Sequence, residues 1–125
     1  MSYTMKTIDE LESIHHGAVK LAGDELGICS FGLQVLDFPA GFSDYPEHDH
    51  AEDGQEEVYV VLDGQADFAV DGERVTISQG EMIKVDATSK RKLQPGREGV
   101  TILAIGSTPG ATYQRPEAFR SRVRA

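Results

Sequence analysis

Residues 58–77 read VYVVLDGQADFAVDGERVTI, and this stretch decides the fold class. Short runs of β-branched and aromatic residues alternate in it with two Asp-Gly pairs, at positions 63–64 and 71–72. An Asp-Gly pair between apolar runs is a strong hairpin signal, because a type I′ turn needs a positive φ at both central residues. We therefore expect two tight turns close together, each between antiparallel strands.

The same pattern of short strands and turns continues on both sides. Residues 29–35 alternate between apolar and polar or small side chains, as in a half-buried strand, and Cys29 is expected to be a small buried apolar residue. Residues 80–85 and 100–105 predict two further strands. Short strands separated by turn residues at regular spacing predict an all-β sandwich or barrel.

The N-terminal part has a different pattern. Residues 7–10, TIDE, match a capping box, and apolar residues at helical spacing follow them. They predict a short N-terminal helix over residues 8–15, which Gly17 would end. His15 and His16 would then lie at the C-terminal end of this helix, beside its exposed carbonyl groups.

Charge is distributed unevenly along the chain. The net charge is −9 at pH 7, yet residues 114–125 carry four Arg and one Glu. Two interpretations are open: the basic extension folds back on the acidic body or on a partner subunit, or the terminus is poorly ordered. The acidic body argues against a nucleic-acid partner, which needs clustered positive charge.

Length and composition place the chain in a simple class. Its 125 residues, 39% hydrophobic and 26% charged, suit one globular domain, and its single cysteine excludes an intrachain disulfide. No stretch approaches the ~20 apolar residues that span a bilayer, and the N-terminus does not resemble a secretory signal. We expect one domain over residues 1–125, with the barrel over about 27–106 and a basic extension over 107–125. We also expect a cytoplasmic location without a membrane partner.

Residues 47–57, EHDHAEDGQEE, hold the candidate for chemistry. Residues two apart on a strand share a face, so His48 and His50 would project together, and Glu57 heads the next strand. Two imidazoles and one carboxylate form a ligand set suited to Fe, Mn, Ni, Cu or Zn. The alternative is that both histidines are surface residues of a solvated acidic loop.

The other acidic side chains of this segment are expected to have a simpler role. Glu52, Asp53 and Glu56 are interpreted as residues that solvate the loop. Glu56 in particular should point away from Glu57, because neighbours on a strand face opposite sides.

The pattern resembles the first motif of the cupin family, in which a glycine, an H-x-H pair, a glutamate and a second glycine follow in order. The matching residues are Gly41, His48, His50, Glu57 and Gly64. The six residues between the glutamate and the second glycine match the family's spacing, whereas the second histidine lies two residues further from the glutamate than usual. Residues 72–82 resemble the second motif, with Ser78 in place of its usual proline.

The resemblance covers residues 29–106 and implies a fold, the double-stranded β-helix or cupin jelly-roll barrel. Such barrels are often homodimers, so a homodimer is expected here. In the family the metal, where present, sits inside the barrel mouth. Carried over residue by residue, this implies His48, His50 and Glu57 as candidate metal ligands.

One position departs from the family pattern. The family's remaining metal ligand is a histidine, and Arg91 stands in its place here. A guanidinium stays protonated and offers no lone pair, and at ~5 Å with an effective dielectric near ~20 it would repel a divalent ion by roughly 3–7 kcal/mol. Either a divalent metal is then bound weakly by three protein ligands, or Arg91 pairs with Glu57 in a metal-free cavity that offers a cation to a carboxylate or phosphate.

The predicted function is the binding of a small, anionic organic molecule in the barrel, with a weak or optional divalent-metal site. Arg91, Tyr59 and Gln34 are the candidate ligand-binding residues, the first by its family position and the other two by strand parity, although core packing suits Tyr59 equally. Two alternatives stay open: a metal-dependent oxygenase or isomerase, and a metal-free sensory or interaction module. The sequence leaves open whether the protein is an enzyme.

Overall fold

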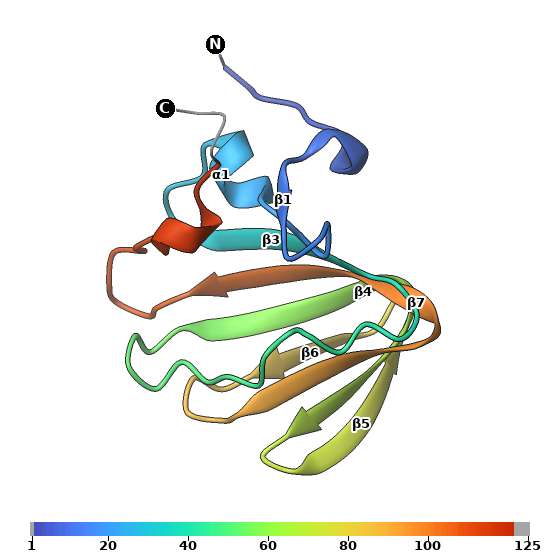
Figure 1. The fold of residues 1–125 in the computed structure, drawn as a ribbon. Helices are drawn as coiled ribbons and strands as arrows, with labels where there is room; N and C mark the ends of the chain where they lie inside the picture. Colours follow the sequence, from blue (N-terminus) through green and yellow to red (C-terminus); the bar gives the residue numbers. More distant parts are fainter. Residues whose placement is uncertain (1, 122–125) are drawn as a thin grey trace.

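The computed structural model describes residues 2–121 and shows an all-β fold (Figure 1). Strands of the described residues form one antiparallel sheet: β1 Ser13–Ile14, β2 Val19–Lys20, β3 Gly32–Phe38, β4 Glu56–Val70, β5 Glu73–Ser78, β6 Met82–Val85 and β7 Arg91–Ser107. Neighbouring strands follow the order β1-β2-β3-β7-β4-β5, and β6 pairs with β4. Short helical turns complete this part of the chain: η1 Ile8–Glu10, α1 Ala22–Leu26 and η2 Glu117–Phe119. No helix among residues 2–121 is long and apolar enough to cross a membrane.

The two longest strands, β4 and β7, pair along most of their length and set the shape of the molecule. Their register runs from Glu56 opposite Ser107 to Val70 opposite Arg91, and it shifts on both sides of Gly64. β6 pairs with the first part of β4, and β5 pairs with the second part. Figure 1 shows both long strands bending at the same edge, so their two halves lie in two layers.

Gly64 lies at this bend, where the sequence predicted a tight turn at residues 63–64. That prediction is wrong, because β4 continues through both residues. Gly64 has a φ of +80° and Gly99 of β7 has a φ of +83°. These positive φ values allow the two strands to bend and shift register without ending. A Cβ added at Gly64 would overlap the carbonyl oxygen of Gly99, which is why the two strands approach closely only with glycine there.

The second Asp-Gly pair forms the predicted turn. Val70 pairs with Glu73, which leaves Asp71 and Gly72 as the loop between β4 and β5. Their φ values of +49° and +84° have the sign that a type I′ turn needs at both positions. The strand predicted near residues 80–85 is also confirmed, as β6.

The helix predicted over residues 8–15 is wrong, because this segment forms only the 3₁₀ turn η1. The predicted capping contact is present: the Glu10 carboxylate accepts a hydrogen bond from the Thr7 N–H at 2.9 Å. The chain then pairs as the β1–β2 hairpin, and β2 extends the sheet beside β3. Pairing with the sheet edge outweighs helical spacing here. His15 and His16 therefore lie in the hairpin turn, with φ values of +55° and +58°, and not at a helix end.

The core fills the space between the layers with apolar and aromatic side chains. The largest fully buried side chains of this core cluster are Tyr59, Phe38, Phe68, Leu36, Leu93 and Ile102. β3 begins only at Gly32, so Cys29 lies in the connection between α1 and β3. The prediction that Cys29 is buried is wrong: its side chain is exposed, because it precedes the strand.

The C-terminal residues fold back over the body as far as Ser121. Figure 1 shows the chain after β7 crossing toward α1. Arg115 of this stretch lies 3.5 Å from Asp24 of α1, so the basic extension meets the acidic body, as the first of the two interpretations expected. Residues 122–125, which contain two of the four arginines, lie outside the described residues.

Candidate metal centre

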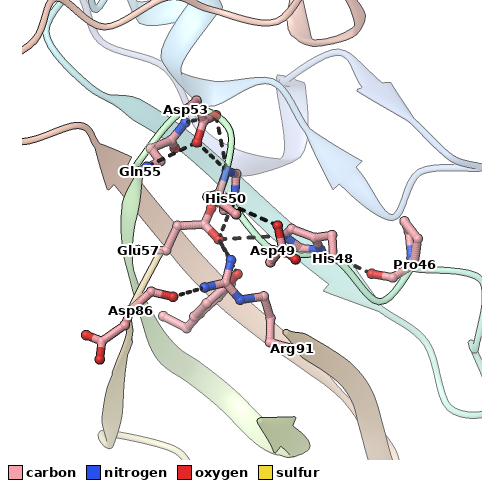
Figure 2. Close-up of polar contacts among 11 residues, drawn as sticks. Pro46, His48, Asp49, His50, Asp53, Gln55, Glu57, Asp86 and Arg91 are labelled. Atoms are coloured by element: carbon pink, nitrogen blue, oxygen red, sulfur yellow. Dashed lines mark hydrogen bonds and ion pairs between the residues drawn. The ribbon is translucent and has the colours of Figure 1, made fainter. Parts of the chain in front are cut away.

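His48 and His50 lie in the long connection between β3 and β4, and main-chain hydrogen bonds hold both. The His48 N–H donates to the Arg91 carbonyl oxygen at 3.0 Å, and the Arg91 N–H donates to the His48 carbonyl oxygen at 2.9 Å. The His50 N–H donates to the Ala87 carbonyl oxygen at 2.8 Å. The two imidazoles therefore share one side of an extended segment and are largely buried, with 25% and 18% of their side-chain surfaces exposed (Figure 2).

The carboxylate oxygen Oε1 of Glu57 is the centre of the site (Figure 2). His50 Nε2 lies 3.1 Å from this oxygen and His48 Nε2 lies 3.6 Å from it. The potential ligand atoms of these three residues all lie within 4.8 Å of one another. The structure thus brings together the three side chains that the sequence singled out, at a spacing that one ion can bridge.

The outer nitrogens of the imidazoles determine what the inner nitrogens can do. His48 Nδ1 lies 3.1 Å from the Pro46 carbonyl oxygen, and His50 Nδ1 lies 3.1 Å from Asp53 Oδ1. A carbonyl oxygen and a carboxylate only accept hydrogen bonds, so both Nδ1 atoms carry the proton and a neutral ring keeps its lone pair on Nε2. In this tautomer the buried Nε2 of His50 has no proton to donate to Glu57, so among the described residues it makes no hydrogen bond.

Asp53 therefore has a different role from the one predicted. The expectation that it only solvates the loop is wrong, because it fixes the orientation of His50, and its Oδ1 also accepts a hydrogen bond from the Gln55 N–H at 3.0 Å. Glu52 is exposed, as expected. Glu56 lies on the outer face, where it pairs with Lys84 at 3.3 Å and points away from the site.

Arg91 lies directly behind Glu57. Its side chain is fully buried, Nη1 donates to Glu57 Oε1 at 3.1 Å, and Nη2 donates to the Asp86 carbonyl oxygen at 2.8 Å. Nε has no hydrogen-bond partner within the part of the chain that the structure describes. The ion pair that the sequence analysis considered is thus present, and the Arg91 charge is compensated by Glu57.

The charges of the site follow from these contacts. Burial by itself raises the pKa of Glu57, but hydrogen bonds from Tyr59 and from the protonated forms of His48 and His50 outweigh it and hold the pKa well below its usual range. The hydrogen bond that protonated His50 donates to Glu57 raises the pKa of His50, and burial opposes this. Burial, together with the Glu57 charge, raises the pKa of Tyr59 well above its usual value, so this phenol stays protonated and donates to Glu57 Oε1 at 2.5 Å. Glu57 is ionised, as a metal ligand must be.

A cavity of about 230 Å³ opens over the three candidate ligands. Gln34 lines it, as the sequence predicted. Tyr59 and Arg91 do not belong to its described lining, because both side chains lie behind Glu57. Both donate hydrogen bonds to the carboxylate of Glu57, and their contact with a ligand stays a prediction.

Further lining residues were missed from the sequence. Gln55 precedes Glu57 by two positions, so strand parity could have found it. Gly106 pairs with Glu57, and a Cβ there would overlap the Gln55 amide, so this glycine makes room for the polar side of the cavity. Tyr113 and Phe119 reach the cavity from the C-terminal residues, and no local sequence signal marks them.

A curved antiparallel sheet with two imidazoles and a carboxylate converging at one cavity defines the class of jelly-roll barrels with a potential metal site. Residues 34–106 match the family model described as Cupin domain, and the chain belongs to the cupin family.

Solved structures agree on this fold. A cupin protein from Bacteroides fragilis is 19% identical, with 93% of this chain and 92% of that chain covered and a TM-score of 0.72. KdgF from Halomonas sp. is 11% identical, with 94% and 98% covered and a TM-score of 0.69. A sugar phosphate isomerase of the cupin superfamily from Silicibacter pomeroyi is 19% identical, with 83% and 75% covered and a TM-score of 0.68. No curated protein matches the chain significantly.

Proposed function

We propose that this cupin binds a small organic anion in its cavity, on a divalent transition metal held weakly by His48, His50 and Glu57. The observation that carries the proposal is the convergence of two Nε2 atoms on an ionised carboxylate, with both Nδ1 atoms held by acceptors. Three such donors fit a metal ion and leave coordination positions open. When bound, the metal supplies a Lewis-acid site for an anionic oxygen.

The positive charge of Arg91 affects both the affinity for the metal and the charge of the ligand that the site favours. Its fixed positive charge beside Glu57 lowers the affinity for a divalent cation, which makes the metal site weak. The same charge cancels that of Glu57, so a bound ion keeps its full double charge. This favours an anionic partner, although the described cavity lining contains no Lys or Arg.

The rest of the lining suits an organic acid with an apolar body. Gln34 and Gln55 offer amide donors for oxygen atoms near the metal ligands. Tyr45, Tyr113 and Phe119 supply aromatic surface for carbon atoms. A cavity with a few polar groups on one side and aromatic walls elsewhere is typical of small-molecule sites.

A second candidate is a metal-free binding module. The observation that favours it is that Glu57 accepts hydrogen bonds from Tyr59 at 2.5 Å and Arg91 at 3.1 Å, so groups of the protein already compensate its charge. In this case the protonated forms of His48 and His50 would bind the anion directly through their Nε2–H groups. A metal-dependent isomerase or oxygenase stays a further alternative. The open coordination positions and the neighbour named as a sugar phosphate isomerase are compatible with it.

Metal titration of protein purified without an affinity tag tests the proposal. We expect the wild type to bind one equivalent of Mn²⁺, Co²⁺ or Zn²⁺, and His48→Ala/His50→Ala to bind at least 100-fold more weakly. His16→Ala is the matched control, because His16 is exposed and outside the cavity, and it should bind like the wild type. Equal affinity in the double variant would overturn the ligand set. Metal-independent binding of acetate by the wild type would favour the metal-free module.

A further inference from the structure

The two sides of the cavity come from different parts of the chain. The metal ligands and both glutamines lie between residues 34 and 106, the range that matches the family. Among the described residues, the lining residues outside the matched range are His15, in the β1–β2 hairpin turn, and Tyr113, Pro116 and Phe119. The last three belong to residues 108–121, here called the C-terminal wall. The family match therefore does not account for this part of the cavity.

The C-terminal wall begins at the metal site itself. Thr108 Oγ1 donates a hydrogen bond to the Asp53 carbonyl oxygen at 2.8 Å. The side chain of Asp53 is the one that orients His50. The first residue of the wall is thus fixed to the loop that positions one imidazole.

Tyr113 is held against the sheet by close packing on a glycine. A Cβ at Gly32 of β3 would lie 2.9 Å from Tyr113 Oη and 3.2 Å from its Cζ. The phenol therefore occupies the space that a side chain would need. The guanidinium of Arg115 lies over the Tyr113 ring, 5.8 Å from its centre.

The far end of the wall is anchored to α1. Asp24 Oδ2 accepts a hydrogen bond from the Ser121 N–H at 2.6 Å, and Asp24 Oδ1 lies 3.5 Å from Arg115 Nη1. Arg115 Nη2 also donates to the Ile28 carbonyl oxygen at 2.5 Å. Asp24 and Ser121 are both buried, so these contacts are shielded from water. Anchors on both sides hold Phe119 in place, where it packs on the core.

We propose that the C-terminal wall determines which ligands the cavity admits, and that the substrate class is a short carboxylate with a compact apolar body. The inference rests on the proposed function for the carboxylate end. The size limit rests on the wall: its aromatic side chains close the cavity at about 230 Å³, below the ~300–1,000 Å³ typical of drug-sized sites. Phe119 is the specificity-determining residue, because it is half-buried and faces the cavity from η2.

Removal of the Phe119 ring tests the proposed role of the C-terminal wall. The probes are a small carboxylate and a carboxylate whose aromatic ring would fill the space that the Phe119 ring leaves. Acetate and phenylacetate are titrated into the wild type, Phe119→Ala and Phe119→Leu, both metal-free and with Zn²⁺, and the imidazole signals of His48 and His50 are followed by NMR. We expect the ratio of the phenylacetate Kd to the acetate Kd to fall at least tenfold in Phe119→Ala, and less in Phe119→Leu. Phe31→Ala is the matched control: Phe31 is also half-buried but lies outside the cavity, so its ratio should stay within twofold.

The outcomes separate the two proposals. Three results would contradict the proposed role of the C-terminal wall in ligand selection. These are an unchanged ratio of the two Kd values in Phe119→Ala, an equal fall of that ratio in Phe31→Ala, and failure of phenylacetate to bind Phe119→Ala. Failure of Zn²⁺ to bind the wild type would overturn the metal site alone, since the ratio is also measured without metal. Phe119→Leu retains a large apolar side chain, so the test stands even where Phe119→Ala is poorly folded.

Discussion

Two sides of the cavity are held by different forces. One carries the candidate metal ligands His48, His50 and Glu57 and is here called the metal-ligand side, and the other is the C-terminal wall. On the metal-ligand side, main-chain pairing places the side chains: Glu57 lies opposite Gly106, and His48 lies opposite Arg91. The wall depends on a few side-chain contacts, such as those of Asp24 with residues about 90 positions away in the sequence. Ladder pairing is distributed over many bonds, whereas the wall depends on single anchors, so we expect the wall to be the less stable side.

The largest effect is expected on the metal-ligand side. Glu57→Gln leaves the fully buried Arg91 without its charged partner, and loss of one partner of a buried ion pair costs roughly 3–5 kcal/mol. Urea unfolding measures this loss. Glu56→Gln is the matched control, because Glu56 is exposed on the outer face, and its effect should stay within about 0.5 kcal/mol. Equal effects would mean that the buried pair does not stabilise this side.

A smaller effect is expected at the wall. Asp24→Asn weakens the acceptor of the Ser121 N–H and removes the charge beside Arg115, which should lower the free energy of unfolding by about 1–3 kcal/mol. Hydrogen exchange should rise in residues 113–121 and remain unchanged in β4. A Zn²⁺ affinity that falls as far as in Glu57→Gln would contradict the independence of the two sides.

The smallest effect concerns the link between the sides, at Asp53. The carboxylate of Asp53 adds to the effect of the hydrogen bond that His50 donates to Glu57, which raises the pKa of His50, so Asp53→Asn should lower that pKa in the metal-free protein. NMR titration of the imidazole measures it. Protonated His50 stabilises the fold below its unfolded-state pKa of ~6.5, and this stability is lost as the pH rises through the raised folded-state value. Metal binding needs the neutral ring and should strengthen over the same rise. If the pKa of His50 is the same in Asp53→Asn as in the wild type, Asp53 does not connect the two sides of the cavity electrostatically.

Two identical dipeptides show how far local sequence reaches. Asp71-Gly72 forms the predicted turn, whereas Asp63-Gly64 lies inside a continuous strand. The positive φ of the glycine is the same requirement in both places. What differs is the partner: Gly64 lies beside the bend of β7 at Gly99, so the paired strands bend together and neither reverses. The local sequence specified the positive φ of each glycine, and the neighbouring strand determined whether the chain forms a turn or a bend there.

The N-terminal helix failed for a related reason. Apolar spacing over residues 8–15 suited a helix, and the capping contact at Glu10 forms. The spacing of apolar residues carries no information about the edge of β3, with which β2 pairs as a strand. His15 consequently lines the cavity from a hairpin turn, a place that no local pattern indicated.

The sequence by itself determined the all-β class and the identity of the three candidate metal ligands. Strand geometry alternates with a period of two, so the spacing of His48 and His50 already indicates a shared face, and the resemblance to the cupin motif adds Glu57. Only the tertiary structure decided that Arg91 lies buried behind Glu57 and that Phe119 closes the cavity. These contacts join residues far apart in the chain, and their formation depends on the packing of whole strands and segments, which no local periodicity encodes.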